Sequence, residues 1–311
     1  MKVFVTGASG FTGAHIMRFL STQEDIVLTG LTRGCSSSVS DSTGKSWVNA
    51  DLLDRDRLIK VISEICPDII IHLAALNHGT FTDLLNTNAV GTKNLLDAAL
   101  KANLECRTLV VSSSAIYGYA ASTALPETSL PKPMNEYGVS KSAQDILSLM
   151  YHEIRGAQVA VARPFNLVGP DQIGSSVCGR IIQQIVEIEK GKKETLDLFE
   201  ILSNRDFIDV RDVVKGYWAL ISHPEFEYIC AGRAFNIGSG KASAIHEVID
   251  LIERITGDQY RVKLPDVHTP IHTQSQQSDN SRIYNATGWK PAIPFKDSLR
   301  DMLEAARKKA S

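Results

Sequence analysis

Short runs of β-branched and aliphatic residues alternate with longer amphipathic stretches through the first half of the chain. The short runs predict strands at 3–6, 26–31, 46–49, 69–73, 108–112 and 159–162. In the longer stretches apolar residues recur at helical spacing, which predicts helices at 12–21, 55–66, 82–102 and 137–155. Strands and helices that alternate in this way build a parallel sheet with helices on its faces. The pattern therefore predicts an α/β fold with a doubly wound parallel sheet.

The alternation loosens after Arg163 and Pro164, where glycine, proline and serine accumulate between 169 and 176. Helices are predicted near 180–190, 243–256 and 296–308, and a polar loop over 266–281. Residues 210–222 again have a helical pattern that could return to the first sheet. We therefore predict a larger domain over 1–165, with a return of about 207–223, and a smaller one over 166–206 and 224–311.

Charge and composition exclude several classes of protein. The 311 residues carry 33 Lys and Arg against 35 Asp and Glu, a formal net charge of −2, with 43% hydrophobic residues. No block of basic residues forms a stripe, so the electrostatic signature of a nucleic-acid-binding protein is missing. We expect a small molecule, not nucleic acid, as the partner.

Cysteine usage and the length of the apolar runs bear on the compartment. The five cysteines are scattered and never spaced C-x-x-C, so neither a disulfide framework nor a metal site is indicated. Strand-like sequence begins at Lys2, which leaves no room for a secretory signal peptide. The longest apolar runs are far shorter than the roughly 20 residues that cross a bilayer. These features predict a cytoplasmic protein that does not span a membrane.

A glycine-rich turn follows the first predicted strand, with Gly7, Gly10 and Gly13 spaced G-x-x-G-x-x-G and Phe11 and Thr12 inside it. Such a turn needs residues that tolerate positive φ and lets the backbone approach a pyrophosphate at a helix N-terminus. A tight structural turn is the alternative interpretation. Directly after a strand in a βαβ series, the motif favours a dinucleotide-binding domain of the Rossmann type over 1–165.

The end of the second strand bears on the choice of cofactor. Proteins that bind NAD commonly carry an acidic residue here for the adenosine ribose, but this chain has Arg33, followed by Ser36, Ser37 and Ser38. A guanidinium suits the oxygens of a 2′-phosphate, so NADP is preferred and NAD is the alternative. Arg33 could also be an ordinary surface residue. After the third strand, Asp51 and Leu52 could meet the adenine edge, although Asp51 could instead cap the next helix.

Two further segments carry candidate chemistry. Tyr137 and Lys141 stand at i and i+4 of a predicted helix, on one face, where an ammonium would lower the pKa of the phenol. A predicted strand ends in the hydroxyls of Ser112, Ser113 and Ser114, any of which could hold a substrate oxygen. Each segment alone is common, as helix surface or strand terminus. Together with the glycine turn they predict proton exchange with a carbonyl or alcohol.

At these residues the chain resembles the extended short-chain dehydrogenases/reductases that act on nucleotide sugars. The resemblance covers essentially the whole chain and extends to His72-Leu73-Ala74-Ala75, Asn88, Arg163-Pro164-Phe165-Asn166, the segment around Arg205, and Phe235-Asn236-Ile237-Gly238. Among the branches of the family, the chain looks most like the GDP-4-keto-6-deoxy-mannose reductases. The resemblance makes 166–206 and 224–311 a substrate-binding domain and implies a homodimer formed through 82–102 and 137–155.

The resemblance also implies roles for single residues. It gives catalysis to Ser113, Tyr137 and Lys141, and substrate binding to Ser114, Asn166 and Arg205. It adds Leu73, Ala74, Ala75 and Pro164 to the cofactor site formed by Gly7, Gly10, Phe11, Thr12, Gly13, Arg33, Asp51 and Leu52, which Tyr137 and Lys141 also join.

Residue types beside Ser113 narrow the reaction. The dehydratases of this family have acidic residues directly after that position, and its 3,5-epimerase/reductases have a cysteine two residues on, whereas this chain has Ser114 and Ala115. Reduction of a sugar ketone remains, with an NAD-dependent 4-epimerase as the alternative. A non-catalytic dinucleotide-binding regulator is a further alternative, which the presence of both Tyr137 and Lys141 disfavours.

The substrate end departs from the family pattern. Arg205 matches the first of two diphosphate-binding arginines, but the second falls in 267–272, where no arginine occurs. Loss of one charge-assisted contact would remove roughly 1.5–3 kcal/mol of binding. His268 or His272, beside Thr269, could compensate only partly. The pattern leaves open an altered nucleotide sugar or a substrate without a diphosphate.

Overall fold

A computed structural model describes residues 1–33, 39–40, 46–119, 124–172, 174, 176–265 and 275–310. In this part of the chain eight strands form the main sheet, in the order β11-β7-β6-β5-β1-β2-β4-β3. All neighbours are parallel except the short edge pair of β3 (Val39–Ser40) and β4. The other strands are β1 (Lys2–Thr6), β2 (Val27–Thr32), β4 (Ser46–Asn49), β5 (Ile69–His72), β6 (Arg107–Val111), β7 (Val159–Pro164) and β11 (Ala234–Ile237).

The order of the strands reverses beside β1. The chain runs from β1 outward through β2 to β4 and β3, and then returns to build β5, β6 and β7 on the other side. At such a switch point the loops after neighbouring strands turn apart and leave a crevice at the carboxyl edge of the sheet. The glycine turn after β1 therefore lies at this crevice.

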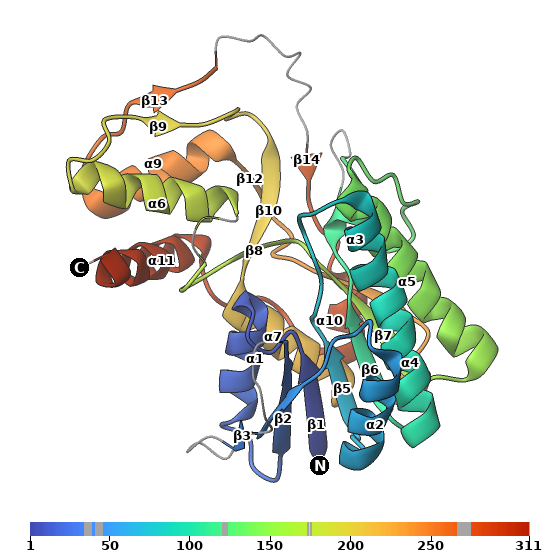
Figure 1. Cartoon of the computed structure of the whole chain (residues 1–311). Coiled ribbons are helices and arrows are strands. Elements are labelled where there is room, and N and C mark those ends of the chain that lie inside the picture. Colours follow the sequence, from blue (N-terminus) through green and yellow to red (C-terminus); the bar gives the residue numbers. More distant parts are fainter. Residues whose placement is uncertain are drawn as a thin grey trace.

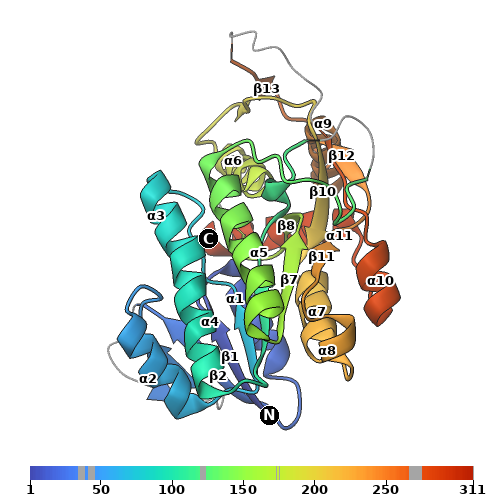
Figure 2. The same ribbon diagram turned by 90° about the vertical axis from the view of Figure 1, so that its right-hand side faces the viewer.

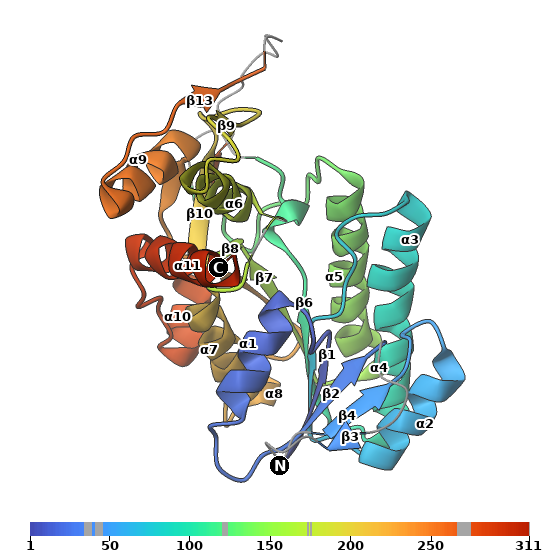
Figure 3. The ribbon, with the colours of Figure 1, turned by 60° about the vertical axis from the view of Figure 1, so that its left-hand side comes forward.

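Apolar side chains on both faces of the strands explain the two helical layers. Phe4 and Ile70 point to the face that α2 (Arg55–Ile65) and α4 (Gly91–Ala102) cover, while Val3, Val5 and Ile71 point to the opposite face. That opposite face packs against α1 (Phe11–Leu20) and α7 (Val210–Ile221). Figures 1 and 3 show α1 and α7 on one side of the sheet, with α2, α4 and α5 (Glu136–Arg155) on the other. The predicted doubly wound α/β fold is confirmed.

One predicted helix contains an irregular turn. The helix predicted over 82–102 is α3 (Phe81–Leu85), a π-helical turn η1 (Asn86–Val90) and α4 in continuous succession. A π turn inserts one extra residue and changes the direction of the side chains that follow, and such turns are frequent at functional sites. The hydrophobic period of the sequence does not reveal a single inserted residue.

A smaller unit follows β7 and lies above the carboxyl edge of the main sheet (Figures 1 and 2). Among its described residues, β10 (Asn204–Asp209) pairs with β12 (Ala242–Ala244), β14 (Ser275–Gln276) and β8 (Asn166–Val168). Its core joins α6 (Val177–Glu189), α9 (Ile245–Thr256) and α11 (Phe295–Ala310), close to β9 (Leu196–Asp197) and β13 (Val262–Lys263). Three further short elements lie elsewhere in the chain: the 3-10 turn η2 (Ser114–Ile116) after β6, α8 (Phe226–Ile229) after α7, and α10 (Ser281–Thr287) after β14.

Two segments of the second half contact the first unit. Helix α7 packs on α1, where the sequence predicts a return of about 207–223. Strand β11 pairs with β7 in the main sheet, although the predicted boundary puts all of 224–311 in the second unit. A four-residue strand flanked by turns gives no sequence signal of which sheet it joins. The division into domains stays a prediction.

Within the described residues, none of the helices is both long and apolar enough to span a membrane.

Candidate active site

The glycine turn is shaped by two close backbone approaches. Gly7 has φ +66°, and a Cβ there would lie 2.7 Å from the amide nitrogen of Ala74. A Cβ on Gly13 would lie 2.1 Å from the carbonyl oxygen of Gly7. Side chains are therefore excluded where the loop after β5 meets the start of α1. Gly10, the N-cap of α1, has no side chain to occupy the first-turn N–H groups, which suits them to a pyrophosphate.

Beside this turn a cavity of about 230 Å³ opens at the carboxyl ends of β1, β2, β4 and β5. Eight of the predicted cofactor residues line it, together with five that were not among them: Ser9, Leu31, Thr32, Ala50 and Thr87. The eight are Gly7, Gly10, Arg33, Asp51, Leu52, Leu73, Ala74 and Ala75. The other predicted cofactor residues, Phe11, Thr12, Gly13, Tyr137, Lys141 and Pro164, lie outside its lining. In a doubly wound fold dinucleotides bind at this edge of the sheet, so the cavity is a candidate site for the adenosine half of one.

Two residues at the mouth of this cavity bear on the cofactor. Arg33 is exposed at the end of β2, while Ser36, Ser37 and Ser38 lie outside the described residues. Asp51 accepts a hydrogen bond from the amide of Leu53 at 2.9 Å, and the N-cap of α2 is Asp54, which accepts from the amide of Arg57 at 3.1 Å. Asp51 therefore closes its own turn at the cavity, and capping of the helix falls to another residue.

Tyr137 and Ser113 meet at the carboxyl edge of the sheet. Ser113 follows β6 and caps η2, and Tyr137 lies in the first turn of α5, whose N-cap Asn135 accepts from the amide of Gly138 at 2.7 Å. The Ser113 hydroxyl lies near enough to the Tyr137 phenol to affect its pKa. Burial raises the pKa of Tyr137, against the lowering effect of the Ser113 hydroxyl. The phenol therefore keeps its proton at neutral pH and can act as an acid.

Lys141 lies one turn further along α5 and is almost fully buried. Its Nζ donates to the carbonyl oxygen of Val111 at 2.6 Å and to Oε1 of Gln144. Burial lowers the pKa of Lys141 to about 7, and the charge of Asp145 acts in the opposite direction. The sequence argument expects Lys141 to lower the pKa of Tyr137; instead, desolvation is the dominant cause and raises it. The i, i+4 spacing predicts the shared face but not the burial.

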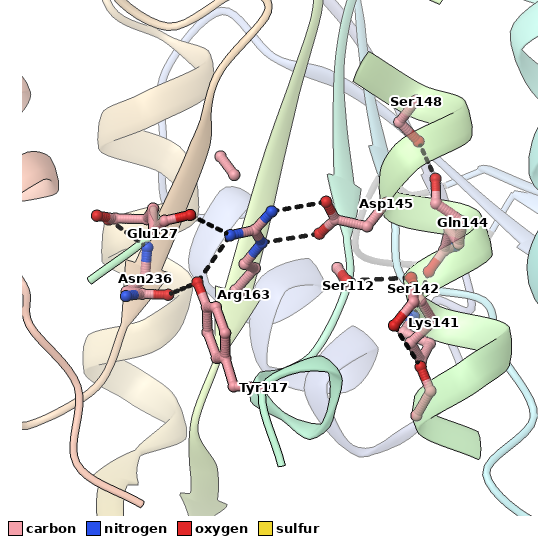
Figure 4. A network of polar contacts seen from close by, with 12 residues as sticks. Ser112, Tyr117, Glu127, Lys141, Ser142, Gln144, Asp145, Ser148, Arg163 and Asn236 are labelled. Atoms are coloured by element: carbon pink, nitrogen blue, oxygen red, sulfur yellow. Dashed lines mark hydrogen bonds and ion pairs between the residues drawn. The ribbon is translucent and has the colours of Figure 1, made fainter. Parts of the chain in front are cut away.

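A buried ion pair fixes α5 against the sheet (Figure 4). Arg163 of β7 donates two hydrogen bonds to the Asp145 carboxylate, at 2.9 and 2.8 Å, and a third to the Tyr117 hydroxyl at 2.7 Å. Tyr117 in turn donates to Oδ1 of Asn236 on β11 at 2.7 Å. This network ties α5 to the edge of the main sheet, and so fixes where Tyr137 stands.

A second cavity, of about 400 Å³, lies between α5 and the smaller unit. Tyr137, Asn166 and Arg205 line it, although they come from three different elements. Its other lining residues are Asn77, Leu167, Gln172, Ser176, Val177, Cys178, Arg180, Glu200, Phe207 and Ile245. Ser114, predicted for substrate binding, is buried outside this lining and donates to Oε1 of Gln276 at 3.2 Å.

Two arginines give this cleft its charge. The Arg205 guanidinium lies over the Tyr119 ring, 4.9 Å from its centroid, which holds its orientation. Arg180, in the first turn of α6, also lines the cleft and is a residue that the sequence reasoning missed. The signal that could have found it is a cation at a helix start, where it opposes the dipole. His268, Thr269 and His272 lie outside the described residues.

No cluster of three or more His, Cys, Asp or Glu side chains that could hold a metal occurs among the residues described.

Comparison with known proteins supports a nucleotide-sugar enzyme. The family model described as GDP-mannose 4,6 dehydratase matches residues 4–302. A GDP-6-deoxy-D-mannose reductase of Pseudomonas aeruginosa is 35% identical, over 97% of this chain and 96% of the relative. A GDP-6-deoxy-D-talose 4-dehydrogenase of Aggregatibacter actinomycetemcomitans is 29% identical, over 93% and 92%. The solved structure of RMD from Pseudomonas aeruginosa complexed with NADPH superposes with a TM-score of 0.84 at 33% identity, covering 99% of both chains.

Proposed function

This chain belongs to the GDP-mannose 4,6-dehydratase family of extended short-chain dehydrogenases/reductases, and from that premise we propose that it reduces the keto group of a nucleotide-linked 4-keto-6-deoxy sugar with NADPH. It is an enzyme of the NAD(P)-dependent type, as its relatives are.

The observation that carries the proposal is which acid and base side chains line the cleft. Tyr137 lines the cleft, keeps its proton through burial and lies near Ser113, which acts on its pKa in the opposite direction. Among the described lining residues the one carboxylate, Glu200, accepts bonds from Ser203 and from the amide of Leu202 at 3.0 Å. Next to Ser113 stand Ser114, which bonds Gln276, and Ala115. Among the described lining residues, Tyr137 can donate a proton, and the carboxylate of Glu200 is already bonded to neighbouring residues. This arrangement suits reduction, which needs one proton donor, better than elimination of water, which needs a second acid/base group.

We infer the following roles for the residues in the proposed reaction. The cofactor, held at the glycine turn and the adjoining cavity, supplies a hydride to the carbonyl carbon when bound. Tyr137 then donates its phenolic proton to the carbonyl oxygen, which gains negative charge as the hydride arrives. Ser113 holds the same oxygen by a hydrogen bond. Lys141, one helical turn further along α5, would compensate the negative charge left on Tyr137.

The preference for NADPH over NADH rests on Arg33. Its guanidinium is exposed at the end of β2, on the lining of the adenosine cavity, where a 2′-phosphate would lie. No acidic side chain stands at that strand end. Asp51, the carboxylate on this lining, belongs to the loop after β4.

The substrate is proposed to carry a diphosphate. Arg205 and Arg180 line the same cleft as Tyr137 and offer two guanidinium groups to phosphate oxygens. Arg180 supplies the second cation that the sequence lacks near Thr269. The reacting sugar would lie between these arginines and the Tyr137 hydroxyl.

The deciding experiment is a screen of GDP-linked and other nucleotide-linked 4-keto-6-deoxy sugars by the absorbance of NADPH. We expect consumption of NADPH with one such sugar and formation of the corresponding alcohol. The alternative, an NAD-dependent 4-epimerase, would appear as protein that purifies with tightly bound NAD and interconverts sugars without net NADPH consumption. Cofactor binding without turnover on any sugar would favour the regulator.

A cytoplasmic homodimer is also proposed. Four apolar side chains, Val139, Ile146, Met150 and Ile154, follow one another along α5 and are all exposed. Figure 2 shows α5 beside α4 on an outer face of the molecule, and Val90 at the start of α4 is exposed as well. A second copy of this helix pair would cover such a stripe. Light scattering should then give twice the chain mass, and Ile146→Asp should give a monomer.

A further inference from the structure

A line of buried hydrogen bonds runs beneath the catalytic helix, from Lys141 on α5 across to β1. Its members are Lys141, Gln144, Thr92, His72 and Thr6, which belong to four different elements. All five residues are buried: Lys141 is 2% exposed, and the other four are fully buried. We call this set the buried relay. At the β1 end, the amide of Ala74 donates to the Thr6 hydroxyl at 3.1 Å, beside the glycine turn.

Thr92 determines the direction of the relay. Its hydroxyl has one hydrogen, which it donates to the carbonyl oxygen of Asn88 at 2.6 Å. It must therefore accept from its two other neighbours, Nε2 of Gln144 at 2.7 Å and Nε2 of His72 at 2.8 Å. The π turn just before α4 is where Asn88 lies, so the irregular turn sets the Thr92 hydroxyl.

His72 follows from the same reasoning. With its hydrogen on Nε2, its Nδ1 accepts from the Thr6 hydroxyl at 2.7 Å. Burial and the charge of Lys141 lower the pKa of His72 to about 3, so the ring is neutral. A neutral ring with one donor and one acceptor fits this place in one tautomer, and its Nε2–H occupies one of the two acceptor positions of the Thr92 hydroxyl.

The amide of Gln144 is then fixed in one orientation. Its Nε2 must face Thr92, which accepts, so its Oε1 must face Lys141, which donates to it. The Lys141 ammonium has three N–H donors, of which Gln144 and the carbonyl oxygen of Val111 take two. One donor is left for the reacting groups.

We propose that Gln144 is a positioning residue, whose amide, oriented by Thr92 and His72, holds the Lys141 ammonium at the floor of the active site. The claim about the position of Lys141 is independent of the substrate, and its consequence for turnover rests on the proposed reductase function. The charged and titratable groups that act on Lys141 or feel its charge are His72 on β5 and Asp145, which is paired with Arg163. Tyr137 stands four residues earlier, on the same face of α5.

The first test needs no substrate. Lysine labelled at Cε is titrated by NMR in the full-length protein, with Lys141→Met to identify the Lys141 signal. Gln144→Leu removes the acceptor of the ammonium, so the Lys141 pKa should fall below its already lowered value. Thr92→Val removes the acceptor of the Gln144 amide and lets that amide rotate, so it should lower the Lys141 pKa less than Gln144→Leu does. Thr92→Ser keeps the hydroxyl, and its Lys141 pKa should match that of the wild type.

Ser148→Ala is the matched control for this titration. Ser148 is buried on the same helix and donates to the backbone carbonyl of Gln144 at 2.8 Å, outside the relay (Figure 4). It should leave the Lys141 pKa unchanged. An equal Lys141 pKa in the wild type and in folded Gln144→Leu, with a cooperative melt to prove folding, would overturn the proposal.

The second test is kinetic. Thr92→Val should lower kcat about 10-fold, the scale of one lost buried hydrogen bond, with little change in the KM for NADPH. The basic limb of the kcat/KM profile should move to lower pH, because the reaction needs charged Lys141. Thr92→Ser should restore both. If Thr92→Val loses kcat but the basic limb of its kcat/KM profile does not move, the role of Thr92 is merely structural. The same holds if Thr92→Ser does not restore kcat. If no substrate is turned over, the proposed function fails while the titration still decides the role of Gln144.

Discussion

Tyr137 is the residue from which the proposed reaction takes its proton. Because burial raises its pKa, the phenol is protonated over the whole neutral range and serves reduction directly. Tyr137→Phe should lower kcat by on the order of 100-fold or more, the scale for loss of a general acid. The Kd for NADPH, measured by fluorescence titration, should change little. Normal turnover by the variant would show that another group is the acid.

Substitution of Arg33 tests the preference for NADPH over NADH. If its guanidinium meets a 2′-phosphate, the wild type should bind NADPH more tightly than NADH, and Arg33→Ala should remove about 1.5–3 kcal/mol of that difference. Calorimetry with both cofactors measures the two values. Arg18, a surface residue in the last turn of α1, offers a matched control, since Arg18→Ala should leave the ratio unchanged. Stronger binding of NADH by the wild type would contradict the assignment.

How far single residues could be predicted depended on whether their role is local. The spacing of Gly7 and Gly13 indicates a tight turn, and the close approaches at both positions agree with it. The spacing of Tyr137 and Lys141 gives a shared helix face but not which buried groups surround it. Arg180 was missed because its neighbour in the cleft, Arg205, is far away in sequence and on another element.

At the scale of elements, α5 depends on one buried ion pair for its position against β7. Asp145→Ala would leave the Arg163 guanidinium buried without its carboxylate, which should cost about 3–5 kcal/mol of unfolding free energy. The exposed pair of Arg300 and Asp297 on α11 is the control, because Asp297→Ala should cost less than about 1 kcal/mol. Denaturant titration measures both. Equal losses would mean that the buried pair does not anchor the helix.

Sequence periodicity predicted the regular elements of the first unit closely, since strands such as β5 are apolar on both faces and bounded by turns. It did not predict η1, because one inserted residue leaves the surrounding period intact. The short strands β8, β10 and β11 also escaped prediction. Their pairing is decided by long-range contacts that neither propensity nor period encodes.

The proposed reaction needs both units of the molecule at once. The glycine turn and Tyr137 belong to the main sheet and its helices, whereas Arg205 and Arg180 come from β10 and α6 of the smaller unit. The cavity that Tyr137 shares with the two arginines lies where these units meet. Diphosphate binding would therefore position the sugar over the cofactor from the opposite wall of the cleft.

Arg205 and Arg180 hold the substrate end of the cleft, so they can be tested separately from the catalytic residues. Arg205→Ala should lower kcat/KM, and the ratio of the wild-type to the variant value should correspond to a loss of about 2–4 kcal/mol of transition-state binding. Truncation removes a charge-assisted bond and leaves a phosphate oxygen poorly paired. Arg180→Ala should cost less, since Arg180 is exposed and lacks an aromatic ring such as Tyr119 to orient it among the described contacts. If both grip one diphosphate, the double variant should lose an amount different from the sum of the two single losses. Arg254→Ala, at an exposed arginine in the last turn of α9, should leave kcat/KM unchanged. An unchanged kcat/KM in Arg205→Ala would mean that the substrate carries no diphosphate at that position.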